Sequence, residues 1–202
     1  MTLGGEKLFD EVVRTVSKWS PRGVKLLSNG VRLTCPTPHV GPEAWLHVLF
    51  PPLTHGELRE MEKKLGIPLP DDFRDFLLMT NGLMLFSQHV SVWGVRKNMA
   101  RSGDKAWQPY DLLDHNSGAE RPAYSPEDVI FFASADEGRN WCFFEFDDES
   151  YRVGKTDRHH FRPDAYWSAF GNWLLDEIRS LALLFNADGE LEIERVNQTT
   201  EW

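Results

Sequence analysis

The sequence predicts a single α+β domain, and three observations support that prediction. The chain has 202 residues, of which 41% are apolar and 12% aromatic, enough for one well-buried core. Apolar residues recur at helical spacing in some segments and alternate, or run together, as in strands in others. No change of composition, internal repeat or low-complexity tract divides the chain into two full domains.

The first 50 residues predict an amphipathic helix followed by a hairpin. Over residues 6–19 the apolar side chains share one helical stripe, made of Leu8, Val12, Val16 and Trp19 with Phe9 and Val13 beside it. Pro21 is expected to end this helix. Apolar positions alternate from residue 24 to 34 around Asn29-Gly30, a dipeptide that favours a tight hairpin turn. A strongly apolar strand is expected over residues 44–50.

Two short helices joined by a proline-bounded elbow follow. Thr54 and Glu57 match a capping box, so a helix is expected to start there and to end at Gly66. Pro70 suits the first position of the next helix, because its missing N–H costs nothing there. Asp71 and Asp72 lie in the first turn of this second helix, where their charge is favourable. Its buried stripe is expected to consist of Phe73, Phe76 and Leu77, and Asn81-Gly82 is expected to end it.

The middle of the chain predicts strands interrupted by a long loop. Residues 83–95 have strand composition, and Trp93 is expected in the core. Residues 96–126 predict a long variable loop with up to one helical turn, anchored by Leu112 and Leu113. Further strands are expected over residues 129–133 and 141–146, and a short edge strand over 151–155.

The last part of the chain predicts the longest helix, starting at Pro163. Its buried positions are Tyr166, Phe170, Trp173, Leu174, Ile178, Leu181 and Leu184. A turn at Asp188-Gly189, a final strand over 191–196 and a loose tail to Trp202 complete the prediction.

These motifs, in this order, resemble the SUKH superfamily, which contains bacterial immunity proteins and fungal cell-wall regulators. The matching residues are Leu69-Pro70-Asp71-Asp72-Phe73, Phe76-Leu77, Asn81-Gly82 and, in the closing helix, Phe170 and Trp173. Residues 57–66 are similar to the family's opening helix, and residues 129–146 to its paired central strands. The resemblance spans about residues 51–185. It leaves residues 1–50 as an N-terminal extension, 96–126 as an enlarged loop and 186–202 as a C-terminal turn, strand and tail.

The resemblance implies a mixed, mainly antiparallel sheet with helices packed on one side, and a domain that binds protein partners without an active site. Many bacterial members of the family are similar to cytoplasmic antidotes that block a toxin domain, commonly a nuclease or another nucleic-acid-modifying enzyme. Fungal members resemble scaffolds that couple signalling to cell-wall synthesis.

The net charge indicates the class of partner, and the cysteine content indicates the compartment. The formal charge of −9 disfavours nucleic acid and anionic membrane surfaces and would attract a basic protein surface. Cys35 and Cys142 form no metal or disulfide framework, so the reducing cytoplasm is the simplest compartment. We expect neither a signal peptide nor a membrane span, because no charged start precedes an apolar run and no stretch of about 18 apolar residues occurs.

Two sets of residues are candidates for partner binding. The first is an acidic strip, consisting of Asp136, Glu137, Glu145, Asp147, Asp148 and Glu149, which either opposes a basic groove or is solvated surface. The second is Trp107 with Tyr110 in the polar loop. Trp141 and Phe143 alternate with Cys142 and Phe144, so that strand presents aromatic side chains on both faces, and we expect burial.

Nothing in the sequence predicts a metal, a cofactor or a catalytic group. His159-His160 lacks accompanying ligands at metal-site spacing, no glycine motif would hold phosphate, and no serine lies in a nucleophile elbow. The leading hypothesis is therefore a non-catalytic immunity protein that occludes a toxin domain. The alternatives are a regulatory scaffold that docks through residues 1–50 or the long loop, and a metal-dependent hydrolase that uses the acidic strip.

Overall fold

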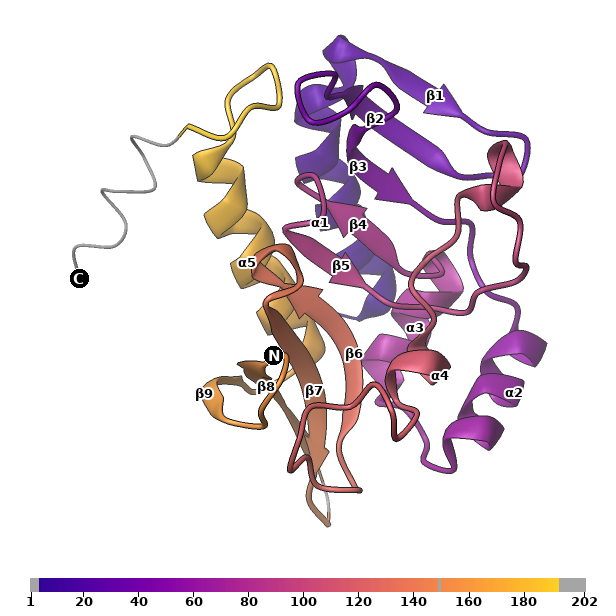
Figure 1. Cartoon of the computed structure of the whole chain (residues 1–202), viewed down its shortest axis with the longest axis vertical. Coiled ribbons are helices and arrows are strands. Elements are labelled where there is room, and N and C mark those ends of the chain that lie inside the picture. Colours follow the sequence, from indigo (N-terminus) through magenta and orange to yellow (C-terminus); the bar gives the residue numbers. More distant parts are fainter. Residues whose placement is uncertain (1–3, 149, 193–202) are drawn as a thin grey trace.

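The computed structural model describes residues 4–148 and 150–192, and within them nine strands form one antiparallel sheet (Figure 1). Each strand pairs only with its neighbours along the chain, so the spatial order is the sequence order. The strands are β1 (Val24–Leu26), β2 (Arg32–Pro36), β3 (Trp45–Leu49), β4 (Leu83–Leu85), β5 (Val90–Val92), β6 (Ile130–Ala135), β7 (Asn140–Phe146), β8 (Tyr151–Asp157) and β9 (Pro163–Trp167). The predicted α+β class is confirmed.

Helices cover one face of this sheet, as expected. The helices of the described chain are α1 (Gly5–Val16), continued by the 3-10 helix η1 (Ser17–Arg22), α2 (His55–Leu65), α3 (Asp71–Met79), α4 (Leu112–His115) and α5 (Phe170–Leu184). Of these, α1, α3 and α5 form the layer on this face, whereas α4 belongs to the segment that covers part of the other face. Figure 1 shows α1 and α3 behind the strands, and α1 contacts both α3 and α5. The core between the layers is aromatic: Phe132 of β6 lies 5.5 Å from Phe73 and 5.0 Å from Trp173, measured between ring centroids. No helix in the described residues has the length and apolar character needed to cross a bilayer.

The N-terminal helix belongs to this core. Leu8, Val12, Val16 and Trp19 are all buried, as their stripe predicted. Gly5 allows α1 to approach α3 closely, because a Cβ at this position would lie 2.5 Å from the Cβ of Asp75. The end of the helix differs from the expectation, since Pro21 lies inside the 3-10 turn that continues α1.

The β1–β2 hairpin and the pair of helices α2 and α3 form where the turn and capping residues predicted them. Gly30 has φ 86° in the turn between β1 and β2. The capping box of Thr54 and Glu57 is present, and Gly66 closes α2 with φ 74°. Pro70 is the N-cap of α3 rather than its first helical residue.

Residues 83–95 have the predicted strand character, and they form a hairpin of β4 and β5 whose turn the sequence does not predict. The turn between β4 and β5 places Phe86, Ser87 and Gln88 at φ 53°, 52° and 73°. It contains no glycine, asparagine or proline, so the usual turn signals are missing.

The prediction that a helix starts at Pro163 is wrong. Pro163 begins β9, an edge strand in which its missing N–H is tolerated, and α5 starts seven residues later at Phe170. Tyr166 is therefore a strand residue, 45% exposed. The addition of β9 also makes β8 an interior strand instead of an edge. Of the predicted strand 191–196, Leu191 bridges to Phe185, whereas residues 193–196 and the tail to Trp202 lie outside the described residues.

The segment 96–126 covers part of the second face of the sheet. It includes the predicted helical turn, α4, with Leu112 buried and Leu113 half-buried. Asp104 Oδ2 accepts a hydrogen bond from the Ser28 N–H at 2.8 Å, which ties this segment to the β1–β2 hairpin. Trp107 packs against a second, smaller apolar cluster that consists of Leu27, Val31, Leu33, Val48 and Phe50.

Candidate functional site

Eight of the residues that carry the family resemblance are buried. They are Leu69, Pro70, Phe73, Phe76, Asn81, Gly82, Phe170 and Trp173. Asn81 fixes the start of the long loop, because its side chain accepts from the Val95 N–H at 2.7 Å and donates to the Val95 carbonyl at 2.8 Å. These residues therefore shape the fold and do not themselves form a contact surface.

Asp72 of the same motif joins three elements. The hydroxyl of Tyr151, at the start of β8, donates to Asp72 at 2.6 Å and accepts from the Phe170 N–H of α5 at 2.9 Å. Burial raises the pKa of Asp72 despite this hydrogen bond. Burial, together with the hydrogen bond to Asp72, raises the pKa of Tyr151 as well. The pair thus holds the first turns of α3 and α5 against β8.

Replacing Tyr151 by phenylalanine should lower the free energy of unfolding by about 1–2 kcal/mol, because Asp72 and the Phe170 N–H both lose a buried partner. Urea denaturation of the two proteins measures the difference. Tyr124→Phe is the matched control, since Tyr124 is 89% exposed, and it should leave the midpoint unchanged. Equal midpoints for wild type and Tyr151→Phe would show that the network contributes nothing.

The structure places the acidic strip at two separate locations. Asp136 and Glu137 belong to the turn η3 (Asp136–Gly138), which precedes β7. Glu145 lies near the other end of β7, and Asp147 and Asp148 follow that strand. A seven-residue strand separates the two ends by about 20 Å. Glu149 lies outside the described residues.

The acids of each group have basic or polar neighbours. Asp136 is 3.8 Å from Lys155, and Glu137 is 3.1 Å from His89 and 3.7 Å from Arg139. At the far end Glu145 pairs with Arg152, and Asp147 accepts hydrogen bonds from Ser150. The strip is therefore not one continuous acidic surface.

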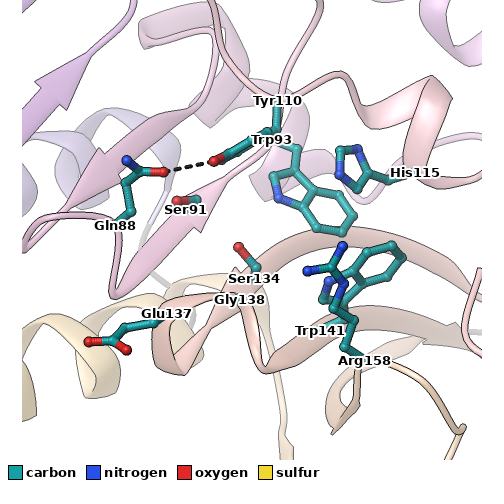
Figure 2. A pocket seen from close by; sticks show the side chains of 10 residues that line it. All are labelled: Gln88, Ser91, Trp93, Tyr110, His115, Ser134, Glu137, Gly138, Trp141 and Arg158. Carbon is teal, nitrogen blue, oxygen red and sulfur yellow. Dashed lines mark hydrogen bonds between the residues drawn. The ribbon is translucent and has the colours of Figure 1, made fainter. Parts of the chain in front are cut away.

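A hollow of about 260 Å³ lies on the sheet face opposite α1, α3 and α5, and Figure 2 shows the side chains around it. Its base is aromatic. Trp93 follows β5 and Trp141 lies on β7; they are 1% and 3% exposed, and their rings meet edge to face at 4.9 Å. His115 of α4 stacks on Trp93 at 4.2 Å, held by a 2.7 Å hydrogen bond between its Nδ1 and the Asp111 carbonyl. We call this hollow, with its lining residues, the indole pocket.

The wall of the indole pocket is polar. The Tyr110 hydroxyl and Gln88 Oε1 are joined by a 2.7 Å hydrogen bond, drawn in Figure 2. Ser91 and Ser134 are paired across β5 and β6, so both side chains project to this face. Arg158, directly after β8, has its guanidinium carbon 5.9 Å from the centre of a Trp141 ring.

Two turns with left-handed backbone border the indole pocket. The β4–β5 turn contributes Gln88, and the β6–β7 turn contributes Glu137 and Gly138. Apart from Gly138, the residues with positive φ in these turns are Phe86, Ser87, Gln88, Asp136 and Glu137. Such conformations are unfavourable for these residue types, and the surrounding structure must impose them. The 3.1 Å contact between His89 Nε2 and Glu137 Oε1 joins the two turns.

An apolar hollow of about 480 Å³ adjoins the indole pocket, and Gln88 lines both. Its apolar side chains are Val40, Trp45, Val48, Met84 and Trp107. Val48, Met84, Ser91, Ser134 and Trp141 form one row of directly paired positions from β3 to β7, so they share a face. The two hollows make a groove across the strands, apolar at one end and polar at the other. We call it the open-face groove.

Of the predicted partner-binding residues, the open-face groove brings together Trp107, Tyr110 and Glu137. Glu145, Asp147 and Asp148 are not part of it. The burial predicted for Trp93, Trp141 and Phe143 is confirmed, and Phe161 covers Phe143 at 4.9 Å on this face. Sequence reasoning missed Gln88, Ser91, His115 and Ser134, which occur in separate segments with no motif of their own.

Residue types that carry chemistry occur elsewhere in structural settings. Burial raises the pKa of the Cys142 thiol well above its ordinary value, so the thiol stays protonated. The backbone N–H groups of His159 and His160 both donate to Asp157. Among residues 4–148 and 150–192, no group of three or more His, Cys, Asp or Glu side chains is arranged to hold a metal ion.

Comparison with known families identifies a matching family model. The model described as the SMI1 / KNR4 family (SUKH-1) matches residues 52–176, more than half of the chain. The matched region contains the buried motif residues up to Trp173 and every residue that lines the indole pocket. A search of curated proteins found no match. On the strength of the family match, which agrees with the elbow motif and its order of elements, the chain belongs to the SMI1 / KNR4 family (SUKH-1).

Proposed function

We propose that this chain is a non-catalytic protein-binding domain, an immunity protein that neutralises a cognate toxin domain by occluding it. The observation that carries the proposal is the open-face groove, which lies on the side of the sheet that α1, α3 and α5 leave free. Membership of the SMI1 / KNR4 family supports it, since the resemblance implies partner binding as the common role.

The groove suits a protein segment. Its apolar end presents Trp45, Met84 and Trp107, and large apolar and aromatic side chains are the usual anchors of protein interfaces. Its other end offers hydrogen-bonding groups that fix the orientation of a segment. The net charge of −9 would speed the association with a toxin domain that has a basic surface. The complex would form in the cytoplasm. This mode of action needs neither cofactor nor metal.

Co-expression tests the proposal. The chain should restore growth to cells that express the toxin domain encoded beside it, and the two should purify together. If the chain neither rescues those cells nor binds that domain, the proposed function is wrong.

Two matched variants show which face of the protein binds the toxin domain. Val40 is 58% exposed and lines the groove, so Val40→Asp should weaken binding at least about tenfold by placing a charge against the apolar contact. Leu183, on α5, is 67% exposed and lies away from the groove, so Leu183→Asp should bind as the wild type does. The opposite pattern would place the contact on the helical face.

A further inference from the structure

The indole pocket is rich in hydrogen-bond donors, although the protein as a whole is acidic. The donors that line it are the hydroxyls of Ser91 and Ser134, the indole N–H groups of Trp93 and Trp141, the amide of Gln88 and the guanidinium of Arg158. In the view of Figure 2 the nitrogen-bearing edges of both indoles lie toward the side where Ser134 is drawn. Neither indole N–H donates a hydrogen bond within the described part of the chain.

Ser91 is the buried donor that lacks a partner. Its side chain lines the pocket and is 1% exposed, and its Oγ makes no hydrogen bond among the described residues. Buried hydroxyl groups are normally paired, because leaving one unpaired is unfavourable. An acceptor atom of a ligand in the pocket would supply the missing partner.

Arg158 adds a positive charge to the wall of the indole pocket. Its guanidinium forms no ion pair within residues 4–148 and 150–192, and it lies near Trp141, with its central carbon 5.9 Å from the centre of a Trp141 ring. Glu137 is the acid at the pocket, and its carboxylate is already held by His89 and Arg139. A cationic side chain entering here would meet the like charge of Arg158, whereas an anion would be attracted.

We propose that the indole pocket binds a carboxylate group of the partner protein, carried by an Asp or Glu side chain or by the chain terminus. The guanidinium of Arg158 provides charge and a planar pair of donors, and the Ser91 hydroxyl provides a short, desolvated hydrogen bond. The buried aromatic base shields the Ser91 hydroxyl from water and so strengthens its hydrogen bond. This inference rests on the proposed function only in that the carboxylate belongs to a protein.

Small probes test the chemistry without the partner. The full chain, labelled with ¹⁵N, is titrated with N-acetylglutamate N-methylamide for a side-chain carboxylate, N-acetylalanine for a terminal one, and N-acetylglutamine N-methylamide as the neutral match. At least one carboxylate should shift the indole N–H signals of Trp93 and Trp141 saturably, and the tighter of the two identifies the source. The glutamine probe should bind at least about tenfold more weakly. The proposal is overturned if neither carboxylate probe binds more tightly than the glutamine probe.

Variants assign the interaction to its residues. Arg158→Gln should weaken carboxylate binding at least about tenfold, and Arg162→Gln, an exposed arginine outside the pocket, should not. Ser91→Ala should weaken binding severalfold without lowering the urea midpoint, because its hydroxyl has no partner in the described protein. Unchanged binding in Arg158→Gln, with a wild-type midpoint, contradicts the proposal.

The same variant separates this inference from the proposed function. If the toxin domain binds wild type and Arg158→Gln equally, the carboxylate inference fails and the immunity function stands. If the carboxylate probes bind in the pocket but no toxin domain does, the inference stands and the immunity function fails.

Discussion

Removal of residues 1–22 is expected to abolish cooperative folding of the remaining chain. α1 and η1 supply four core side chains, Leu8, Val12, Val16 and Trp19, each at most 4% exposed. Burying one large apolar side chain contributes about 1.5–3 kcal/mol, so the four together approach the total stability of about 5–15 kcal/mol typical of a domain. The apolar faces of α3 and α5 that contact α1 would also be exposed. Thermal unfolding followed by circular dichroism measures the effect.

Point substitutions keep this prediction testable if the truncated chain aggregates. Leu8→Ala alone should lower the free energy of unfolding by about 2–5 kcal/mol, because it leaves a cavity between the helices and the sheet. Lys7→Ala, on the exposed side of the same helix, should have little effect. A truncated chain that melts cooperatively near the temperature of the full chain would show that the helix is dispensable.

The packing of α1 also bears on the alternative that residues 1–50 serve as a separate docking segment. The family match begins only at residue 52, yet the first helix lies within the common core. Partner binding lost after deletion of this segment would therefore follow from unfolding. Substitutions on the exposed side of α1 at Glu6, Lys7 and Asp10 test docking without disturbing the core.

The stability of the protein should fall steeply as the pH decreases from about 6.5 to about 3, and His47 is the main single cause we identify. Burial lowers the pKa of His47 to about 3 from the ordinary value of 6.5. The folded state therefore keeps the ring neutral, whereas the unfolded chain takes up a proton below pH 6.5. Because the unfolded state binds more protons in this range, the free energy of unfolding decreases as pH falls, by about 5 kcal/mol in total at 1.36 kcal/mol per pH unit.

The surroundings of His47 explain why its ring stays neutral. Its side chain is fully buried on the helix side of β3, 5.1 Å from the ring of Trp19 and 4.8 Å from that of Phe86. Nδ1 lies 3.4 Å from the Phe86 N–H, and Nε2 has no hydrogen-bond partner among the described residues. Among the described residues no carboxylate favours the charged form of the ring, and burial is the cause of its lowered pKa.

His47→Leu should flatten this pH dependence. The test is urea denaturation of the variant and the wild type at several pH values between 7 and 3.5, comparing how the two stabilities change. His160→Leu is the control, because His160 is exposed and should leave the dependence as it is. If His47→Leu loses as much stability toward acid as the wild type does, the buried histidine is not the cause.

The sequence predicts those parts of the fold that local signals determine. The capping box at Thr54, the left-handed Gly66 and the apolar stripes of α1 and α3 each depend on residues within one or two turns. The β4–β5 turn and β9 were missed for the opposite reason. The left-handed backbone of Phe86 to Gln88 is imposed by tertiary contacts, and Pro163 suits an edge strand as well as it suits a helix start.

The candidate site is less predictable, because it is assembled from many segments. The sequence predicts three of its residues: Trp107 and Tyr110 as aromatic side chains in a polar loop, and Glu137 as part of the acidic strip. Ser91 and Ser134 became neighbours only through the register between β5 and β6, and nothing near either serine in the sequence indicates that pairing.

The strictly sequential strand order has a consequence for how the protein is made. A ribosome releases the strands in the order in which they pair, so each new strand can join the growing edge of the sheet as it emerges. The helical layer cannot assemble strictly in the order of synthesis, because α1 contacts α5, the last helix of the described chain. The part of α1 that packs on α5 therefore stays exposed to solvent on the nascent chain until residues 170–184 have been made, whereas α3 can cover its neighbouring part much earlier.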